Sequence, residues 1–309
     1  MPDRSDRILG GLHGLLVGDA LGVPYEFHPA SEVPAWEAID LTPPPGFRRS
    51  HPHVPPGYWS DDGSQALCLL ASLLYRGELD LEDFGRRLLN WRNFGYLAAG
   101  GMVFDIGLQT SRALDALESG VPAEESGPTG ERDNGNGSLM RVLPLVLWHR
   151  GGDEELFRDA GLQSLVTHGH PRSRLCCGLY CLWARRTLEG YPEAWSAAVS
   201  RVRELTGSDP AAQEELESSI LPDREATGSG YVVDCLHSAR IALREETFEG
   251  VVKQAILFGN DTDTTAAVAG GIAGLRHGLS GIPERWIEGL ADRHIVEPLA
   301  DRLVAELES

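Results

Sequence analysis

Apolar residues recur at helical spacing along almost the whole chain, and this periodicity constrains the fold more than any other feature. Three examples are Ile8-Leu12-Leu15-Leu16, Leu67-Leu70-Leu73-Leu74 and Leu81-Phe84-Leu88-Trp91. Positions three and four apart share one face of a helix, so each set forms a stripe that a core can cover. No alternating pattern typical of a strand extends beyond a few residues. We therefore expect an all-α fold of roughly a dozen helices.

The remaining helical patterns and the loops between them fill most of the chain. Gly77 is expected to end the helix that contains Leu67–Leu74. Loops are expected at Leu41–Gly57, which is rich in proline, and at Pro122–Gly137, which is rich in Gly, Glu and Asn. Composition does not change across either loop, so we expect one domain over residues 1–309. The small-residue run Ala266–Gly274 should let its helix approach a neighbour closely. Further helices are expected near 105–118, 138–149, 153–166, 172–188, 231–244, 247–258, 264–277 and 284–307.

Composition excludes several classes of function. The chain has 309 residues and a formal net charge of -19, which disfavours broad nucleic-acid binding because polyanions are repelled. Its five cysteines lie in apolar, helical surroundings and are expected to be reduced core residues, although Cys177 and Cys181 share a helix face that a zinc ion could use. The N-terminus lacks the apolar segment of a signal peptide, and no window approaches the run of about 20 apolar residues that spans a bilayer. These features predict a cytoplasmic protein that makes no membrane contact.

Two acidic clusters look alike chemically. Ser60-Asp61-Asp62 and Asp261-Thr262-Asp263-Thr264 each offer two carboxylates and a hydroxyl at the entrance of an apolar helix. Helix capping explains one such cluster, because Ser, Thr and Asp accept hydrogen bonds from the first amides and suit the helix dipole. Capping uses one side chain, however, and leaves the second carboxylate beside a like charge. A hard cation with oxygen ligands relieves that repulsion, and two facing clusters could hold two cations.

Six short motifs, in a fixed order along the chain, are more informative than any single cluster. They are Gly18-Asp19-Ala20-Leu21-Gly22 with Pro24 and Glu26, Trp59-Ser60-Asp61-Asp62, Asn136-Gly137-Ser138-Leu139-Met140-Arg141, Thr167-His168, Gly230-Tyr231-Val232-Val233-Asp234, and Gly259–Ala267. Together they resemble the ADP-ribosylglycohydrolase family, of the dinitrogenase reductase-activating glycohydrolase type. The resemblance runs from about Ile8 to about Pro298. It implies an all-α hydrolase with two divalent cations, Mg²⁺ or Mn²⁺, in a central cleft.

Carried over position by position, the resemblance implies a set of metal ligands. Position 60 is often threonine in the family, and serine keeps the hydroxyl. Glu26 falls where the family has a glutamate on a mobile segment near the metals; without the motif it would be a solvated loop acid. The implied ligands are Ser60, Asp61, Asp62, Asp261, Asp263 and Thr264.

The central motif has the features of a phosphate cradle. Gly135 and Gly137 permit unusual dihedral angles, Asn136 and Gly137 offer successive backbone amides, and Ser138 is expected to begin a helix. An ordinary glycine turn with a serine cap is the alternative.

Three further site residues follow from the resemblance, and two of them keep a structural alternative. Asp133 resembles an acid that contacts the reacting ribose. Tyr231 matches an aromatic that stacks on adenine, with core packing as the alternative. His168 could donate to the substrate or cap a helix. His51 and His53, in the proline-rich loop, receive no role.

The implied reaction removes ADP-ribose from a target by cleaving the bond at the anomeric carbon of the distal ribose, through an oxocarbenium-like transition state. The two cations would position the ribose and lower the pKa of the attacking water. Asp62 is the candidate for orienting that water, and Glu26 and Asp133 are alternative acid–base groups. The target, whether arginine, serine, a nucleic-acid end or a small compound, and the oligomeric state stay open.

Two other classes of protein stay possible. One is a different two-metal hydrolase, such as a phosphatase or nuclease. The other is an inactive structural member of the family. All four principal aspartates are present, which favours an enzyme, because a buried acid cluster without a cation is costly.

Overall fold

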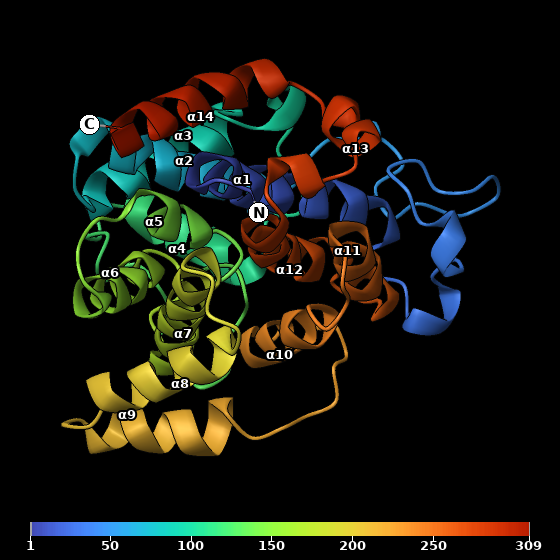
Figure 1. Ribbon diagram of the computed structural model, residues 1–309. Coiled ribbons are helices and arrows are strands. Elements are labelled where there is room, and N and C mark those ends of the chain that lie inside the picture. Colours follow the sequence, from blue (N-terminus) through green and yellow to red (C-terminus); the bar gives the residue numbers. More distant parts are fainter. Residues whose placement is uncertain (1, 309) are drawn as a thin grey trace.

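The computed structural model of the chain describes residues 2–308 and is built from helices (Figure 1). Within these residues there are fourteen α-helices, a few short 3-10 turns and one short π-helical segment. The only β-type pairings there are the isolated bridges Pro29–Gly259 and Gly135–Tyr231. The predicted all-α fold is therefore confirmed. The helices are α1 Arg4–Gly22, α2 Asp61–Arg76, α3 Leu81–Phe94, α4 Leu108–Glu118, α5 Leu143–Trp148, α6 Asp153–Leu165, α7 Pro171–Leu188, α8 Ala194–Leu205, α9 Pro210–Glu215, α10 Val232–Ala242, α11 Phe248–Leu257, α12 Thr262–His277, α13 Glu284–Gly289 and α14 Arg293–Glu308.

Helices α1 and α12, from opposite ends of the sequence, form the central pair of the fold (Figure 1). Glycines recur every fourth residue along α1, so they lie on one face of the helix. A Cβ added at Gly14 would lie 2.4 Å from the carbonyl oxygen of Gly270, and one at Gly18 would lie 2.1 Å from that of Ala266. The backbones therefore touch, which confirms the close approach predicted for Ala266–Gly274. This contact brings the N-terminus of α12 to the C-terminal end of α1.

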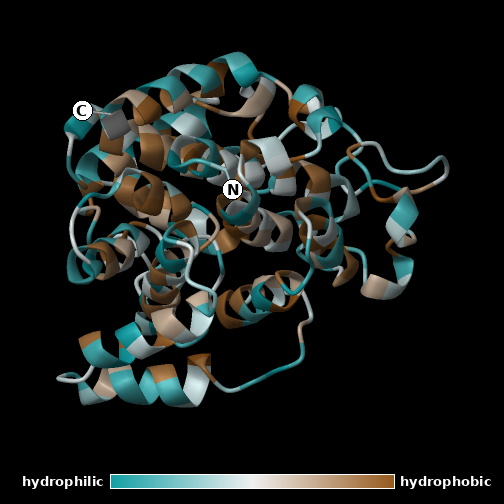
Figure 2. Cartoon of the chain, viewed as in Figure 1, coloured by the Kyte–Doolittle hydropathy of each residue, from teal (hydrophilic) through white to brown (hydrophobic). Residues whose placement is uncertain are grey.

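The remaining helices surround this pair and share its core. One continuous hydrophobic cluster includes residues of α1, α2, α7, α10 and α12. Hydrophobic residues, brown in Figure 2, lie mainly on inward faces, whereas outer helix faces are hydrophilic. All five cysteines are buried and unpaired, as predicted. Gly77 ends α2 in the left-handed conformation (φ 69°), also as predicted.

Three sequence expectations about helices need correction. The expected helix 284–307 is divided, because Leu290 is extended and Asp292 has a positive φ of 45°. The amide of Ala291 donates to the carbonyl of Gly57 (2.9 Å), which fixes the break. The helix expected to begin at Ser138 begins at Leu143, after a series of turns. Helices α8 and α9 were not expected.

Helix α1 also corrects the expectation that no segment could span a membrane. The stretch Arg4–Tyr25 is long and apolar enough to do so by length and composition. In the structure, 89% of its apolar window is buried inside the protein. Its apolar character is explained by its place in the core, where α12 packs along it.

Candidate active site

A cavity of about 540 Å³ opens where the N-termini of α2, α4 and α12 meet. Its acidic walls come from segments far apart in the sequence. Of the residues predicted to bind metal or substrate or to act in catalysis, nine line it: Glu26, Asp61, Asp62, Asp133, Asn136, Gly137, His168, Asp261 and Thr264. Ser60, Ser138 and Asp263 are buried and do not line it. Tyr231 also does not line it.

The start of α2 is held by side chains that leave its two aspartates uncommitted to capping. The Ser60 hydroxyl accepts from the amide of Asp62 (3.3 Å). Asp19, on α1, accepts from the amides of Ser60 (2.9 Å) and Gly63 (2.7 Å). The first-turn amides of Asp62 and Gly63 are therefore satisfied by Ser60 and Asp19. The carboxylates of Asp61 and Asp62 remain available to the cavity.

The start of α12 is arranged differently and is joined to α2. The side chain of Asp261 accepts no helix amide. Its Oδ2 instead accepts from the side-chain nitrogen Nδ2 of Asn136 (2.9 Å). Thr264 donates its hydroxyl to Oδ1 of Asp62 (3.2 Å), across 202 positions of sequence. The two acidic clusters thus meet in one site, and residues 134–137, which we call the glycine loop, contact one of them through Asn136.

The donor atoms fit a hard divalent cation. Oδ2 of Asp62 and Oδ2 of Asp263 are buried and have no hydrogen-bond partner among the described residues. Carboxylate oxygens of Asp19, Asp62 and Asp263 lie within 4.8 Å of one another, as do those of Glu26, Asp261 and Asp263. An unpaired buried carboxylate is costly, and oxygen-only ligand sets are those that Mg²⁺ and Mn²⁺ prefer.

Burial and mutual repulsion raise the pKa of most carboxyls here. Burial, then the charges of Asp105 and other neighbours, raises the pKa of Glu26 to about 11. Burial, then the charge of Asp261, raises the pKa of Asp105 to about 7. Burial raises the pKa of Asp62 and Asp263 well above the usual range, with neighbouring carboxylates adding to it. Without cations these groups therefore hold protons near neutral pH.

The glycine loop lies beside this acidic site. Neither Gly135 nor Gly137 has a positive φ, which corrects the expectation of unusual dihedral angles. Glycine is needed at 137 for space, because a Cβ there would lie 2.8 Å from Cε1 of His168. The amide of Asn136 donates to the carbonyl of Gly230 (3.0 Å), so it is not free to bind an anion.

The other residues predicted to bind substrate lie in different surroundings. Ser138 is fully buried and accepts from the hydroxyl of Ser164 (2.8 Å). His168 is buried beside Thr167, and burial holds its pKa well below the usual range, so its ring is neutral. Tyr231 precedes α10 and lies under the guanidinium of Arg224, 5.7 Å from the ring centre. It therefore packs outside the cavity.

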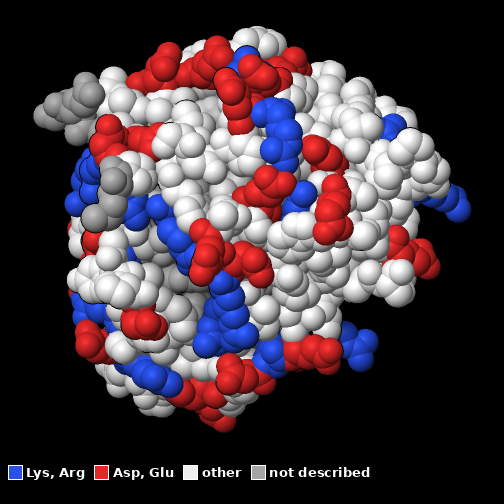
Figure 3. Space-filling model, turned by 45° about the vertical axis from the view of Figure 1, so that its right-hand side comes forward, with Lys and Arg blue, Asp and Glu red and all other residues white. Residues whose placement is uncertain are grey.

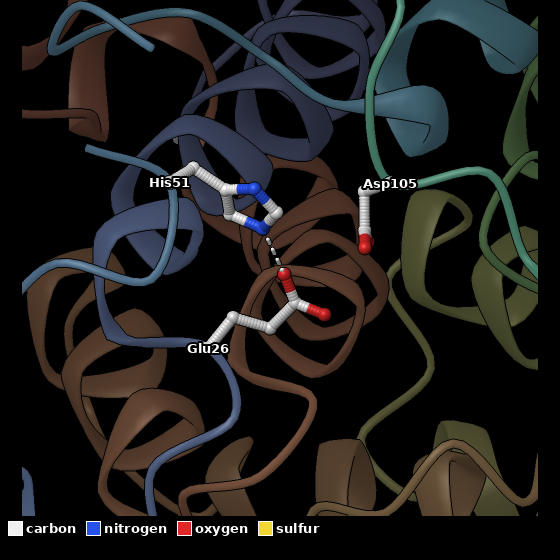
Figure 4. Close-up of side chains that lie close together, drawn as sticks. All are labelled: Glu26, His51 and Asp105. Carbon is white, nitrogen blue, oxygen red and sulfur yellow. Dashed lines mark hydrogen bonds and ion pairs between the residues drawn. The ribbon is translucent and has the colours of Figure 1, made fainter. Parts of the chain in front are cut away.

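Three residues of the site had received no role in the sequence analysis. Asp19 belongs to the first motif, but only the packing of α1 against α2 shows that it holds helix amides. Asp105 lines the cavity with a positive φ of 59°. His51 contacts Glu26, and Figure 4 shows both side chains with Asp105. Neither Asp105 nor His51 belongs to a recognisable motif, so no local sequence signal pointed to them.

Comparison with known proteins identifies the family of the chain. The family model described as ADP-ribosylglycohydrolase matches residues 1–309. ADP-ribosylarginine hydrolase Tri1 of Serratia proteamaculans is 32% identical, over 97% of this chain and 80% of that protein. ADP-ribosyl-[dinitrogen reductase] glycohydrolase of Rhodospirillum rubrum is 28% identical, over 94% of this chain and 92% of that protein.

A solved structure named as an ADP-ribosylglycohydrolase-related protein complex superposes with a TM-score of 0.77 at 34% identity, covering 99% of both chains. The chain therefore belongs to the ADP-ribosylglycohydrolase family. It is accordingly a hydrolase, and the family supports the removal of ADP-ribose from modified targets as its activity. The predicted family and enzyme class are confirmed.

Proposed function

We propose that this protein is a cation-dependent hydrolase that releases ADP-ribose from arginine side chains by cleaving the bond at the anomeric carbon of the distal ribose. The observation that carries the proposal is the meeting of two distant acidic clusters around buried carboxylate oxygens that lack partners. One relative supports the arginine linkage, since it is named for ADP-ribosylarginine, and another, named for ADP-ribosyl-[dinitrogen reductase], supports a modified protein as the target.

Two divalent cations, Mg²⁺ or Mn²⁺, are the proposed cofactors. Ser60, Asp61 and Asp62 would hold them from α2, and Asp261, Asp263 and Thr264 would hold them from α12. When bound, such cations orient sugar hydroxyls and lower the pKa of water. Their charge also offsets the repulsion that otherwise raises the pKa of these carboxyls.

The chain's own groups supply the acid–base chemistry in this proposal. Glu26 is the proton donor to the leaving group, because burial is the first cause of its raised pKa and persists when neighbouring charges are neutralised. Asp62 orients the attacking water. Asp133, at the rim, accepts from the amide of Gly130 (3.1 Å) and contacts the ribose. Asn136, Gly137 and His168 bind the substrate where they line the cavity.

Ser138 and Tyr231 have weaker support as substrate contacts. The hydroxyl of Ser138 is occupied inside the core, and Tyr231 packs beside Arg224. We therefore propose a supporting role for both: Ser138 beneath the glycine loop and Tyr231 at the bridge to Gly135.

The deciding experiment incubates the protein with an ADP-ribosylated arginine peptide and Mg²⁺ or Mn²⁺. Free ADP-ribose and an unmodified peptide are the expected products, and a chelator should abolish their release. Serine-linked substrate serves as the comparison. Release of phosphate in place of ADP-ribose would favour a phosphatase or nuclease, and full activity in excess chelator would contradict the role of the cations.

We also infer a single domain over residues 1–309 in a cytoplasmic protein without broad nucleic-acid affinity. One core cluster that extends over most of the helices and five unpaired cysteines support this. Acidic side chains are prominent on the face shown in Figure 3, with bands of Lys and Arg between them. A single cooperative unfolding transition would support the domain assignment, and tight binding of a random-sequence duplex at physiological salt would contradict the charge argument.

A further inference from the structure

A short part of the proline-rich loop, residues 48–54, lies against the segment that carries Glu26. The amide of Ser50 donates to the carbonyl of Pro24 (3.4 Å), and its hydroxyl donates to the carbonyl of Glu26. We call residues 48–54 the strap. Through Ser50, the strap is fixed to the backbone on both sides of Tyr25. His51, the next residue, therefore has a defined position relative to the Glu26 side chain.

From this position, His51 contacts the carboxyl group of Glu26. Its Nε2 lies 2.7 Å from Oε2 of Glu26, and the two side chains are only 11% and 4% exposed. Figure 4 shows that the imidazole reaches the carboxyl from one side while Asp105 approaches from the other. The three groups bring one atom each within 4.8 Å.

The imidazole ring is in turn fixed by its neighbours. Its centre lies 5.2 Å from that of Phe104, 5.8 Å from that of Phe27 and 6.2 Å from that of His53. Packing on these rings limits the rotamers of His51 and so limits where its Nε2 can lie.

The backbone just after Glu26 is held by Asn260, the residue before the acidic cluster at the start of α12. The amide of Phe27 donates to the carbonyl of Asn260 (2.6 Å), and the amide of Asn260 donates to the carbonyl of His28 (2.7 Å). Phe27 and Asn260 both have positive φ angles near 60°, a strained conformation for side chains other than glycine. These bonds hold the main chain and leave the carboxyl group free to rotate.

Among the described residues, only His51 forms a hydrogen bond with the Glu26 carboxyl group, and Asp105 lies near that group without one. Asp105 is a second acid, so its contact becomes repulsive when both groups are ionised. The imidazole is therefore the partner that holds the carboxyl group in one orientation.

We propose that His51 is a positioning residue that fixes the Glu26 carboxyl group, so that one oxygen is held by the imidazole and the other faces the reacting bond. This inference rests on the proposed function, in which Glu26 works at the cavity. In this proposal, the strap places the imidazole of His51 against the carboxyl group of Glu26, the proposed proton donor.

The first test compares two replacements of similar size in the full-length, cation-loaded protein. His51→Leu removes the hydrogen bond, whereas His51→Gln keeps a donor and an acceptor at the end of the side chain. Loss of an orienting partner of this kind typically costs about 10- to 100-fold. We expect a loss of that size in kcat for His51→Leu with little change in KM, and substantial recovery in His51→Gln.

Arg48→Ala is the control, because Arg48 lies on the same strap, is exposed and makes no ring contact with His51. Its kcat should stay close to that of the unmodified protein. Melting temperatures and the affinity for free ADP-ribose report whether a variant has lost its fold or its cavity. Equal losses in the Leu and Gln variants, with both proteins folded, would overturn the positioning role.

A double-mutant cycle separates this inference from the proposed function. If His51 acts through Glu26, the double variant Glu26→Gln/His51→Leu should be no slower than Glu26→Gln alone. Additive losses would overturn the proposal, because they would mean that His51 acts independently. Full activity of Glu26→Gln would instead contradict the proposed role of Glu26, whereas a slow Glu26→Gln with a normal His51→Leu would refute only the positioning by His51.

Discussion

The entrances of α2 and α12 look alike in sequence but are stabilised differently. At α2, Ser60 and Asp19 accept the helix amides. At α12, the side chain of Asp261 makes no capping bond, and Asp263 accepts only from the amide of Thr264 (2.9 Å). The comparison shows that an acidic helix start identifies a site only when the acids remain after the amides are satisfied. At α2, Asp19 and Ser60 accept the amides, so the carboxylates of Asp61 and Asp62 are not needed for capping. At α12, the carboxylates are little used for capping, because the helix start is left largely uncapped.

Asp263→Asn should produce the largest effect, because it removes a charge from the helix start that is left largely uncapped. The amide keeps the shape but binds a cation poorly. Cation assistance is worth several kcal/mol, so kcat/KM should fall roughly a hundredfold or more. Activity assays with titrated Mg²⁺ or Mn²⁺ measure this.

The same variant should be as stable as the unmodified protein when cations are absent, or more stable, since it relieves repulsion in a buried cluster. Melting curves in chelator check this half of the prediction. Retained activity with a clear loss of stability would mean that Asp263 is structural.

The pH dependence of the chelated protein should be the next largest effect, because several carboxyls contribute. Burial raises the folded-state pKa of Asp19 and Asp105 to about 7, above the ordinary value of 3.8. A raised folded pKa stabilises the protein below the unfolded pKa, and this contribution is lost as pH rises through the folded pKa. The melting temperature in chelator should therefore fall from about pH 4 to about pH 7.

Saturating Mg²⁺ or Mn²⁺ should reduce that fall, because bound cations stabilise the ionised carboxylates. Melting curves at each pH, with and without cation, provide the comparison. A chelated protein whose melting temperature rises across the same window would contradict the raised pKa values.

Asp19→Asn tests the capping side of the comparison and should have a smaller effect. Asparagine keeps one acceptor oxygen but replaces the other with an NH₂ donor, so it cannot accept all three hydrogen bonds that the Asp19 carboxylate accepts from the amides of Ser60 and Gly63. The cation-loaded protein should lose about 1–3 kcal/mol of unfolding free energy, with a smaller loss of activity than Asp263→Asn. Denaturant titration measures the first quantity. An activity and cation affinity as low as those of Asp263→Asn would place Asp19 among the metal ligands, which its proximity to Asp62 and Asp263 permits.

Replacing Ser60 should give the smallest effect and separate its two candidate roles. Ser60→Ala removes the cap on the amide of Asp62 and should cost about 1 kcal/mol of stability. A ligand role adds a loss of cation affinity, measured by calorimetric titration. Ser60→Thr keeps the hydroxyl and should retain both properties; weak cation binding in the threonine variant would contradict the ligand role.

The sequence was sufficient for the class of fold and for the outline of the site. Helical periodicity, Gly77 and the small residues of α12 depend on local geometry, and each prediction from them agrees with the structure. The divided helix 284–289 and 293–308 was not predictable, because its break depends on a contact between Ala291 and Gly57. The helix start at Ser138 was wrong for a similar reason: its hydroxyl is used in the core by Ser164.

What the sequence by itself determined is the helical class of the fold, most of its helices, the two acidic helix starts and the family, because these depend on residue spacing and on motifs. Only the tertiary structure decided which acids stay free of capping and what surrounds them. Thr264 and Asp62 meet across 202 positions, Asp19 reaches the amides of α2, and the strap brings His51 to Glu26. These pairings depend on the close approach of α1 and α12 and on the course of two loops, and no local pattern records which side chains such packing brings within hydrogen-bonding distance.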